Sequence, residues 1–207
     1  MEKYVLDTNL FFNMEPGLGI GSKTDVVMKK VTVAIKNLKN KKKAAFYMPP
    51  SIIKELKTFF KDRESAFLKD FLFEITIKSP DLSKISFPAE VFYKLIQDIR
   101  ERSYKGLLTS EDELKKAVLS LVGIKFKDKK ESQMRIGVFV KNLRERYRQN
   151  TRFGFLDSVA DLDLIVLAKE QDAYLVSTDE GVITWGRIFG IKEMEAAMFG
   201  KKLTHSE

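Results

Sequence analysis

Short apolar runs near both ends of the chain alternate with segments of helical periodicity, whereas the middle is helical and highly charged. Runs of four to eight residues that are rich in β-branched and aromatic side chains are typical of buried strands. Such runs predict strands at 4–6, 44–48, 73–80 and 173–178. The last three include "AAFYM", "FEITIKSP" and "AYLVST". The strands therefore fall near the ends, with none between 81 and 172.

Helical spacing of apolar residues predicts most of the remaining elements. Helices are expected at 23–40, 52–62 and 63–72, after Gly154, and, as a helix or loop, around Trp185. Ser51 is the predicted N-cap of the second helix. Three more helices are expected at 89–108, 109–124 and 130–150, and Thr109 or Ser110 would begin the middle one with a capping box.

Alternation of strands and helices at the two ends predicts an α/β fold, in which the ends form one small parallel sheet flanked by helices. The central helical stretch then projects as an insertion. We expect one domain from residues 1–84 and 150–207, and a helical insertion from residues 85–149.

Composition narrows the chemistry that this fold can perform. The 207 residues include no cysteine and a single histidine, His205, which excludes disulfides, thiolate nucleophiles, Cys/His zinc sites and histidine-based triads. The net charge of +8 suits a polyanionic partner such as nucleic acid, although it also fits a solubility device. No apolar run approaches the roughly 18 residues of a membrane span, and no signal peptide is evident, so we expect a cytoplasmic protein.

Carboxylates gather where a parallel sheet would place a ligand. Asp7 and Asp179 each follow a predicted strand, and the ligand crevice of an open parallel sheet lies outside the carboxyl ends of its strands. Asp157 and Asp161 are four residues apart, which places them on one helix face, with Asp163 further around the helix. Glu55 lies early in the helix after the second strand. Carboxylates about 5 Å apart repel by about 3 kcal/mol per pair, and Mg²⁺ or Mn²⁺ would offset that repulsion and could ionise a water for phosphodiester hydrolysis.

All of these acidic residues except Asp161 also have an ordinary structural interpretation. Asp161 is harder to explain in that way, because Leu164 and Ile165, one helical turn away, are expected to be buried. Asp7 fits a cap of a helix that begins at Thr8, Asp157 fits a helix cap, and Asp179 fits a turn before Gly181. Asp163 and Glu55 fit solvent-exposed helix positions. The set is more specific than any of its members.

The motifs "VLDTN", "PPSIIKEL", "DLDLIVLA" and "LVSTDEG" resemble those of PIN-domain nucleases. The block "GFLDSVADLDLIVLAKEQDAYLVSTDEG" is similar to the homologs of Aquifex RNase P, the minimal protein-only RNase P family, and this resemblance spans nearly the whole chain. It implies a PIN-like sheet with a helical spike, a metal centre of Asp7, Asp157, Asp161, Asp163 and Asp179, and removal of the 5′ leader of precursor tRNA without an RNA subunit. Glu55 matches the general PIN pattern only.

The resemblance also implies that the spike pairs subunits into homo-oligomers, and the apolar stripes of the central helices agree with this, although they could instead pack on the sheet. A basic segment, "KNLRERYRQNTR", precedes the acidic helix and offers Arg144, Arg146, Arg148 and Arg152 to RNA phosphates or to solvent. Two other functions remain open: a toxin-like PIN ribonuclease with another RNA target, and a non-catalytic RNA-binding scaffold.

Overall fold

The computed structural model describes residues 1–12, 18–21, 23–156 and 158–204. Its strands are β1 (Glu2–Leu6), β2 (Ala44–Met48), β3 (Thr76–Ile77) and β4 (Tyr174–Val176). Its helices are α1 (Asn9–Phe12), α2 (Thr24–Asn40), α3 (Pro50–Thr58), α4 (Ala66–Glu74), the 3-10 helix η1 (Leu82–Lys84), α5 (Ala89–Leu121), α6 (Lys129–Arg152), α7 (Val159–Gln171), α8 (Glu180–Ile188) and α9 (Ala196–Thr204). The chain divides into two compact units, Met1–Phe87 with Leu156–Glu207, and Pro88–Phe155.

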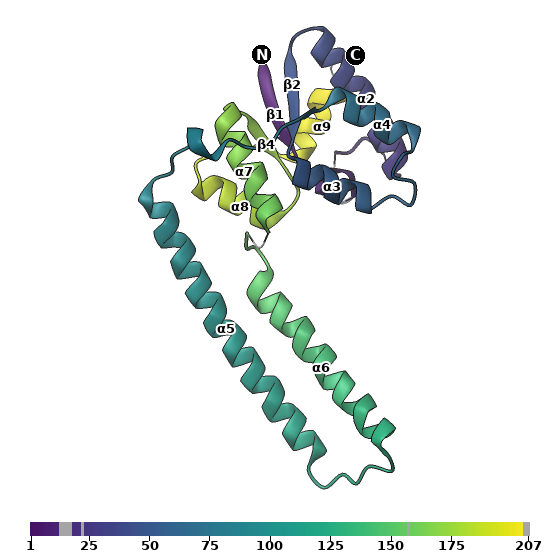
Figure 1. The fold of residues 1–207 in the computed structure, drawn as a ribbon, viewed down its shortest axis with the longest axis vertical. Helices are drawn as coiled ribbons and strands as arrows, with labels where there is room; N and C mark the ends of the chain where they lie inside the picture. The colour runs from purple at the N-terminus through teal and green to yellow at the C-terminus, as the bar shows by residue number, and fades with distance from the viewer. Residues whose placement is uncertain (13–17, 22, 157, 205–207) are drawn as a thin grey trace. The chain divides into compact units, whose positions relative to one another are not determined.

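In the part of the first unit that the structure describes, all strands are parallel and lie in the order β3-β2-β1-β4. This arrangement confirms the predicted α/β fold with a parallel sheet. β1 lies at the centre and pairs with β2 and β4, which come from opposite ends of the chain (Figure 1). The carboxyl ends of β1 and β4 therefore meet at one edge.

Aromatic side chains fill one face of the sheet. Tyr4, Phe46 and Tyr174 lie in register on neighbouring strands, with ring centroids 5.4 and 5.8 Å from that of Tyr4. Phe199 of α9 packs over Tyr4 at 5.1 Å. α9, near the end of the chain, thus seals this face, while α7 packs on β1 and β4.

Two local predictions in this unit are wrong. β3 has two residues rather than eight, because α4 extends through Glu74 and turns Leu68 and Phe71 into the core. Ser51 is not the N-cap of α3, since Pro49 holds that position and Pro50 begins the helix, where its missing N–H costs nothing.

The second unit is a hairpin of α5 and α6, which pack along each other. α5 is one continuous helix of 33 residues, so the predicted break at Thr109 is wrong. Thr109 and Ser110 donate their hydroxyls to the carbonyls of Lys105 and Gly106, 2.8 and 2.9 Å away, and do not cap a new helix. The acidic residues of the expected capping box instead hold the hairpin together, since Arg146 of α6 pairs with both Asp112 and Glu113.

Among the described residues, no helix is long and apolar enough to cross a membrane.

Candidate active site

Asp7 lies at the carboxyl end of β1, beside the end of β4. Its backbone N–H donates to the carbonyl of Val176 at 3.1 Å, which extends the pairing of the two strands. Its side chain is 2% exposed and accepts hydrogen bonds from the hydroxyl of Ser177 and the amide group of Asn9. The sheet therefore holds this carboxylate rigidly at the edge where a ligand would bind.

Asp179 reaches the same edge from β4. Ser177 accepts a hydrogen bond from the backbone N–H of Asp179 at 2.9 Å, so one hydroxyl connects the two aspartates. Asp179 also caps α8, accepting from the N–H of Val182 at 3.0 Å. Asp179 can therefore cap α8 and still lie near Asp7, and its carboxylate remains exposed.

Glu55 approaches from α3. The hydroxyl of Thr8 lies 3.3 Å from Glu55 Oε1 and 3.3 Å from Asp7 Oδ1, which bridges the end of β1 and the helix. The sequence motifs rank Glu55 below the aspartates, yet the structure brings it beside Asp7.

α7 contributes the remaining described carboxylates. Ser158 is its N-cap and accepts from the backbone N–H of Asp161 at 3.0 Å. Asp161 raises the pKa of Glu55 and so lies within its electrostatic range. Asp163 accepts a hydrogen bond from Ser51 at 2.7 Å. Asp157 lies outside the described residues.

Burial and like charge both disfavour ionisation of Asp7 and Glu55. Burial raises the pKa of Asp7, and the carboxylates of Asp179 and Glu55 raise it further, against the hydrogen bonds of Ser177 and Asn9. The pKa of Glu55 is raised mainly by burial and then by the charges of Asp161 and Asp179, with Thr8 opposing. Four side chains distant in sequence, Asp7, Glu55, Asp161 and Asp179, therefore form one electrostatic unit, which we call the acidic cluster.

The donor set of the acidic cluster fits a hard divalent cation. Its atoms are all oxygens, and a cation would relieve the repulsion and the burial cost that raise both pKa values. As placed, no three of the described acidic residues stand close enough together to hold an ion. The fit is thus one of chemistry, and binding would have to draw the carboxylates together.

Three hydroxyl residues that support this site were not predicted from sequence as part of it. Ser177 and Thr8 contact Asp7, and Ser51 orients Asp163. Position offered a signal, because Ser177 is the first residue after β4, as Asp7 is after β1. The segment "PPSII" is also what a helix cap looks like, and nothing in it indicates that the hydroxyl of Ser51 contacts Asp163 of α7.

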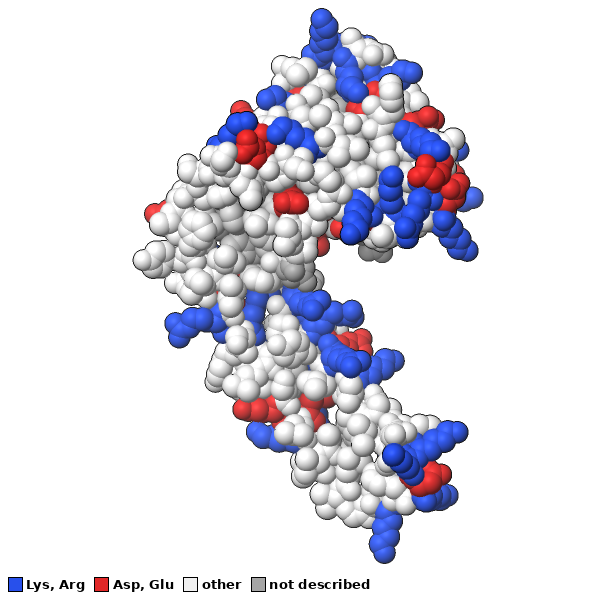
Figure 2. Space-filling model, in the orientation of Figure 1, with Lys and Arg blue, Asp and Glu red and all other residues white. Residues whose placement is uncertain are grey.

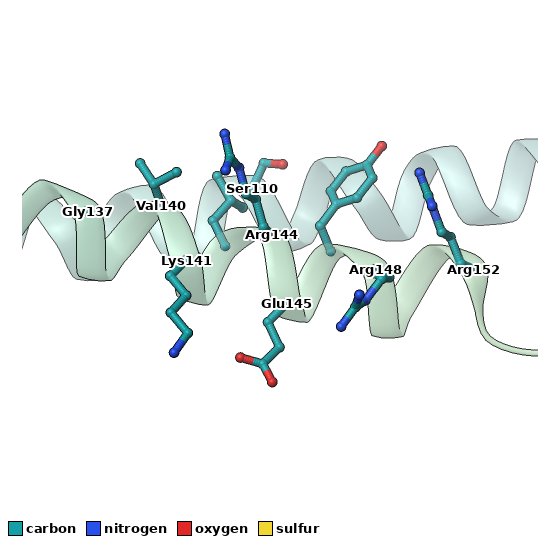
Figure 3. Close-up of a pocket in the computed structure, with 10 residues that line it drawn as sticks. Ser110, Gly137, Val140, Lys141, Arg144, Glu145, Arg148 and Arg152 are labelled. Carbon is teal, nitrogen blue, oxygen red and sulfur yellow. The ribbon is translucent and has the colours of Figure 1, made fainter. Parts of the chain in front are cut away.

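The basic residues belong to the hairpin unit. Lys141, Arg144, Arg148 and Arg152 of α6 line a groove that also includes Ser110 of α5 (Figure 3). Arg146 differs from them, because its guanidinium is engaged with Asp112, 2.7 Å away, and with Glu113. Those carboxylates raise the pKa of Arg146 and anchor it within the hairpin.

Comparison with known proteins agrees with the fold. The family model described as PINc domain ribonuclease matches residues 3–206, and the chain belongs to this family. Within it, the chain is similar to the RNA-free ribonuclease P of Pyrococcus horikoshii, with 37% identity over 99% of this chain and 92% of the relative. The RNA-free ribonuclease P of Thermodesulfovibrio yellowstonii is 35% identical over 92% of this chain and 87% of its own. That of Methanothermobacter thermautotrophicus is 31% identical over 98% and 94%. The resemblance seen in the sequence motifs is confirmed.

Proposed function

We propose that this protein is an RNA-free ribonuclease P, an endoribonuclease that removes the 5′ leader of precursor tRNA and leaves a 5′ phosphate on the mature product. The observation that supports the proposal is the set of hydrogen bonds at the carboxyl edge of the sheet, where Thr8 bridges Asp7 and Glu55 and Ser177 connects Asp7 to Asp179. Near full-length similarity to RNA-free ribonucleases P selects the substrate from those that PIN ribonucleases cut.

Divalent metal is part of this proposal, with Mg²⁺ expected and Mn²⁺ as an equivalent hard cation. The acidic cluster would hold it, and Asp157 and Asp163 remain proposed members of the catalytic set. When bound, the ion supplies an ionised water as nucleophile and stabilises the leaving oxygen of the phosphodiester.

The chain's own residues prepare the site for that chemistry. The hydroxyl of Ser177 and the backbone N–H of Asn9 donate to Asp7, which favours its charged form against burial. Ser51 fixes Asp163 on α7. The chain has no cysteine, so no thiolate is available for this role, and carboxylates are the acidic groups that the site offers.

Substrate would be held by arginine. Arg144, Arg148 and Arg152 line one groove of the hairpin and present guanidinium groups to phosphates, and Arg146 is the weakest of the four proposed contacts because Asp112 and Glu113 already occupy it. We also propose that the hairpin assembles the protein into homo-oligomers and that no RNA subunit is required. A cytoplasmic location is proposed, where precursor tRNA is available.

The test is cleavage of 5′-labelled precursor tRNA by the purified protein, with Mg²⁺ or with EDTA. The expected result is one metal-dependent cut at the leader junction. Asp7→Asn and Asp161→Asn should each lower the rate by about 100-fold or more, as removal of one electrostatic group at a reacting centre does. The control Asp70→Asn removes an exposed carboxylate from α4 and should leave the rate unchanged. Cuts elsewhere in the RNA would indicate a toxin-like ribonuclease, and no cleavage would indicate a scaffold.

A further inference from the structure

Two phenylalanine rings stack at the surface next to the acidic cluster. The rings of Phe12 and Phe59 lie 4.2 Å apart at an interplanar angle of 25°, and Phe60 packs against Phe12 at 5.6 Å. Phe59 is 50% exposed. We call Phe12 and Phe59 the aromatic pair.

The aromatic pair is not needed to fill the core. Its neighbour Phe11 performs that task, because it is 1% exposed and packs edge-on against Phe71 at 5.2 Å. Phe12 and Phe59 lie outside this contact, and Phe12 is half-buried whereas Phe59 is exposed. An exposed ring such as that of Phe59 costs hydration free energy that a binding role would explain.

Chain geometry places the pair one helical turn from the acidic cluster. Thr8 and Glu55 are joined by a hydrogen bond, and each is followed four residues later by one member of the pair. Residues four apart in a helix are neighbours on one face, about 6 Å along the axis, so Phe59 lies one turn beyond Glu55. Phe12 ends α1, the single helical turn that follows Thr8. Phe59 is the C-cap of α3, with its N–H bonded to Leu56, so the backbone holds the ring at this point.

Basic side chains outnumber acidic ones along α3 and the segment that follows it. Lys54, Lys61 and Arg63 are exposed and Lys57 is half-buried, against the exposed acids Asp62 and Glu64. Figure 2 shows Lys and Arg side chains over this part of the surface, with some Asp and Glu among them. An aromatic face rimmed by cations is the combination with which proteins bind single-stranded nucleic acid, since every base has a face to stack and every nucleotide a phosphate to neutralise.

We infer that the aromatic pair stacks an unpaired base of the 5′ leader, next to the phosphate that is cut. This inference rests on the proposed function. The first nucleotides of a mature tRNA are paired in its acceptor stem, so the unpaired bases that adjoin the cut on the same strand belong to the leader. Stacking there positions the scissile phosphate and adds affinity for precursor over product.

The test is a double-mutant cycle in which one change is made in the protein and the other in the RNA substrate. Single-turnover cleavage at subsaturating enzyme is measured on precursor tRNA with an intact leader and with one abasic nucleotide, moved along the leader in turn. At one position the abasic substitution should slow the wild-type protein about 5- to 100-fold. Phe59→Ala should be slowed by a similar factor on the intact leader, and the abasic substitution should then have no further effect.

Variants separate stacking from general damage. Phe59→Trp should retain the rate, and Phe59→Leu, which keeps the apolar volume, should be slowed like Phe59→Ala. Phe73→Ala removes a ring that is 84% exposed on α4 and should behave as wild type. Binding of mature tRNA should be unchanged in all of them.

Several results would overturn the inference. Losses from Phe59→Ala and from the abasic substitution that simply multiply would show that the ring and the base do not touch. The inference would also fail if Phe59→Leu retained the wild-type rate. It would fail as well if Phe59→Ala lost only contacts to the unpaired 3′ end of the RNA and none to the leader. If wild type fails to cut precursor tRNA, the proposed function fails. A single-stranded leader carrying 2-aminopurine then tests the pair, because stacking should quench its fluorescence with wild type and not with Phe59→Ala, and equal fluorescence would contradict it.

Discussion

Asp7 shows how a single residue can cost stability for the sake of function. It is buried at the end of the central strand, beside the negative charges of Asp179 and Glu55, and both circumstances favour its neutral form, with only its hydrogen bonds opposing them. A neutral hydrogen-bonding side chain of the same shape, such as asparagine, would be buried at a lower free-energy cost. The carboxylate is therefore best explained by the cation that its charge would bind.

This cost predicts a pH dependence for the metal-free protein. The pKa of Asp7 is raised above its ordinary value of 3.8, so between that value and the folded pKa the native state binds more protons than the unfolded state. Stability then falls as pH rises through this window, by up to about 1.4 kcal/mol per pH unit. In EDTA, Asp7→Asn should be more stable than wild type at neutral pH, and the difference should shrink as the pH is lowered toward 3.8.

Differential scanning fluorimetry of both proteins from about pH 4 to 8 in EDTA measures the effect. One pH unit within the window corresponds to about 3–5 °C in Tm for a chain of this length. Asp70→Asn, an exposed site, is the control and should show no such trend. A difference between Asp7→Asn and wild type that is the same at every pH would contradict the explanation. Added Mg²⁺ should raise the Tm of wild type and leave that of Asp7→Asn nearly unchanged.

How far the sequence predicts the site depends on how local each signal is. Asp7 and Asp179 are predictable because each follows a strand, and parallel strands end at one edge. Glu55 is underrated by its sequence context because its partner Thr8 lies 47 residues away. A serine before an apolar helix usually caps it, whereas here Pro50 starts the helix and Ser51 contacts Asp163.

At the scale of elements, the hairpin depends on close approach of two long helices. A Cβ on Gly106 would lie 2.8 Å from the ring of Tyr147, so α5 and α6 meet where a residue without a side chain faces an aromatic ring. Gly137 of α6 has nothing within 4 Å of its Cβ position. The two glycines therefore predict opposite effects of the same substitution.

Gly106→Ala should destabilise the hairpin by about 1–3 kcal/mol, the usual cost of overpacking. Gly137→Ala should stabilise it by about 0.5–1 kcal/mol, because alanine is the better helix former and meets no obstacle. Urea denaturation followed by far-ultraviolet circular dichroism checks both. Equal signs for the two substitutions would show that the ring of Tyr147 does not pack as described.

The arginines of α6 should have different roles, in RNA binding for Arg144 and Arg148 and in hairpin stability for Arg146. Arg148→Gln and Arg144→Gln should weaken binding of precursor tRNA and lower the salt slope of the binding constant by about 0.7–0.9 for each phosphate that is no longer neutralised. Arg146→Gln should chiefly lower the Tm, because it leaves Asp112 and Glu113 without their partner across the hairpin. Fluorescence anisotropy across a series of KCl concentrations measures the slopes. A slope that changes most for Arg146→Gln would reverse the assignment.

Elements are predictable where periodicity is long, and prediction fails where tertiary packing decides. The helix at 24–40 and the strand at 44–48 follow directly from their apolar spacing. β3 is short because the apolar residues before it complete α4 and fill the core. The break expected at Thr109 rests on cap chemistry, yet Asp112 and Glu113 pair with Arg146 and the helix continues.

At the scale of the whole molecule, the hairpin exposes a second apolar face. Tyr93, Ile96, Leu107, Leu114 and Val118 recur at helical spacing along α5, and all are exposed. The face packed on α6 is a different one, marked by Gly106, Thr109 and Glu113, which are buried. An apolar face of this kind, interrupted only by charged residues such as Arg100 and Glu111, predicts contact with another protein surface, and the proposed partner is a second copy of the chain.

Replacing Leu114 and Val118 together by glutamine should therefore convert the assembly into smaller species. Each is more than half exposed, at 65% and 55%, so the change should not unfold the hairpin. Size-exclusion chromatography with light scattering measures the mass, and Val33→Gln, an equally exposed valine of α2, is the matched control. A wild-type protein that elutes as a monomer would contradict the assembly. A second subunit of the assembly could also contact the part of the tRNA that is distant from the cut. In that case the double variant should lose more activity on full precursor tRNA than on a minihelix that retains only the acceptor stem and leader. The reason is that the shorter RNA does not extend to the second subunit.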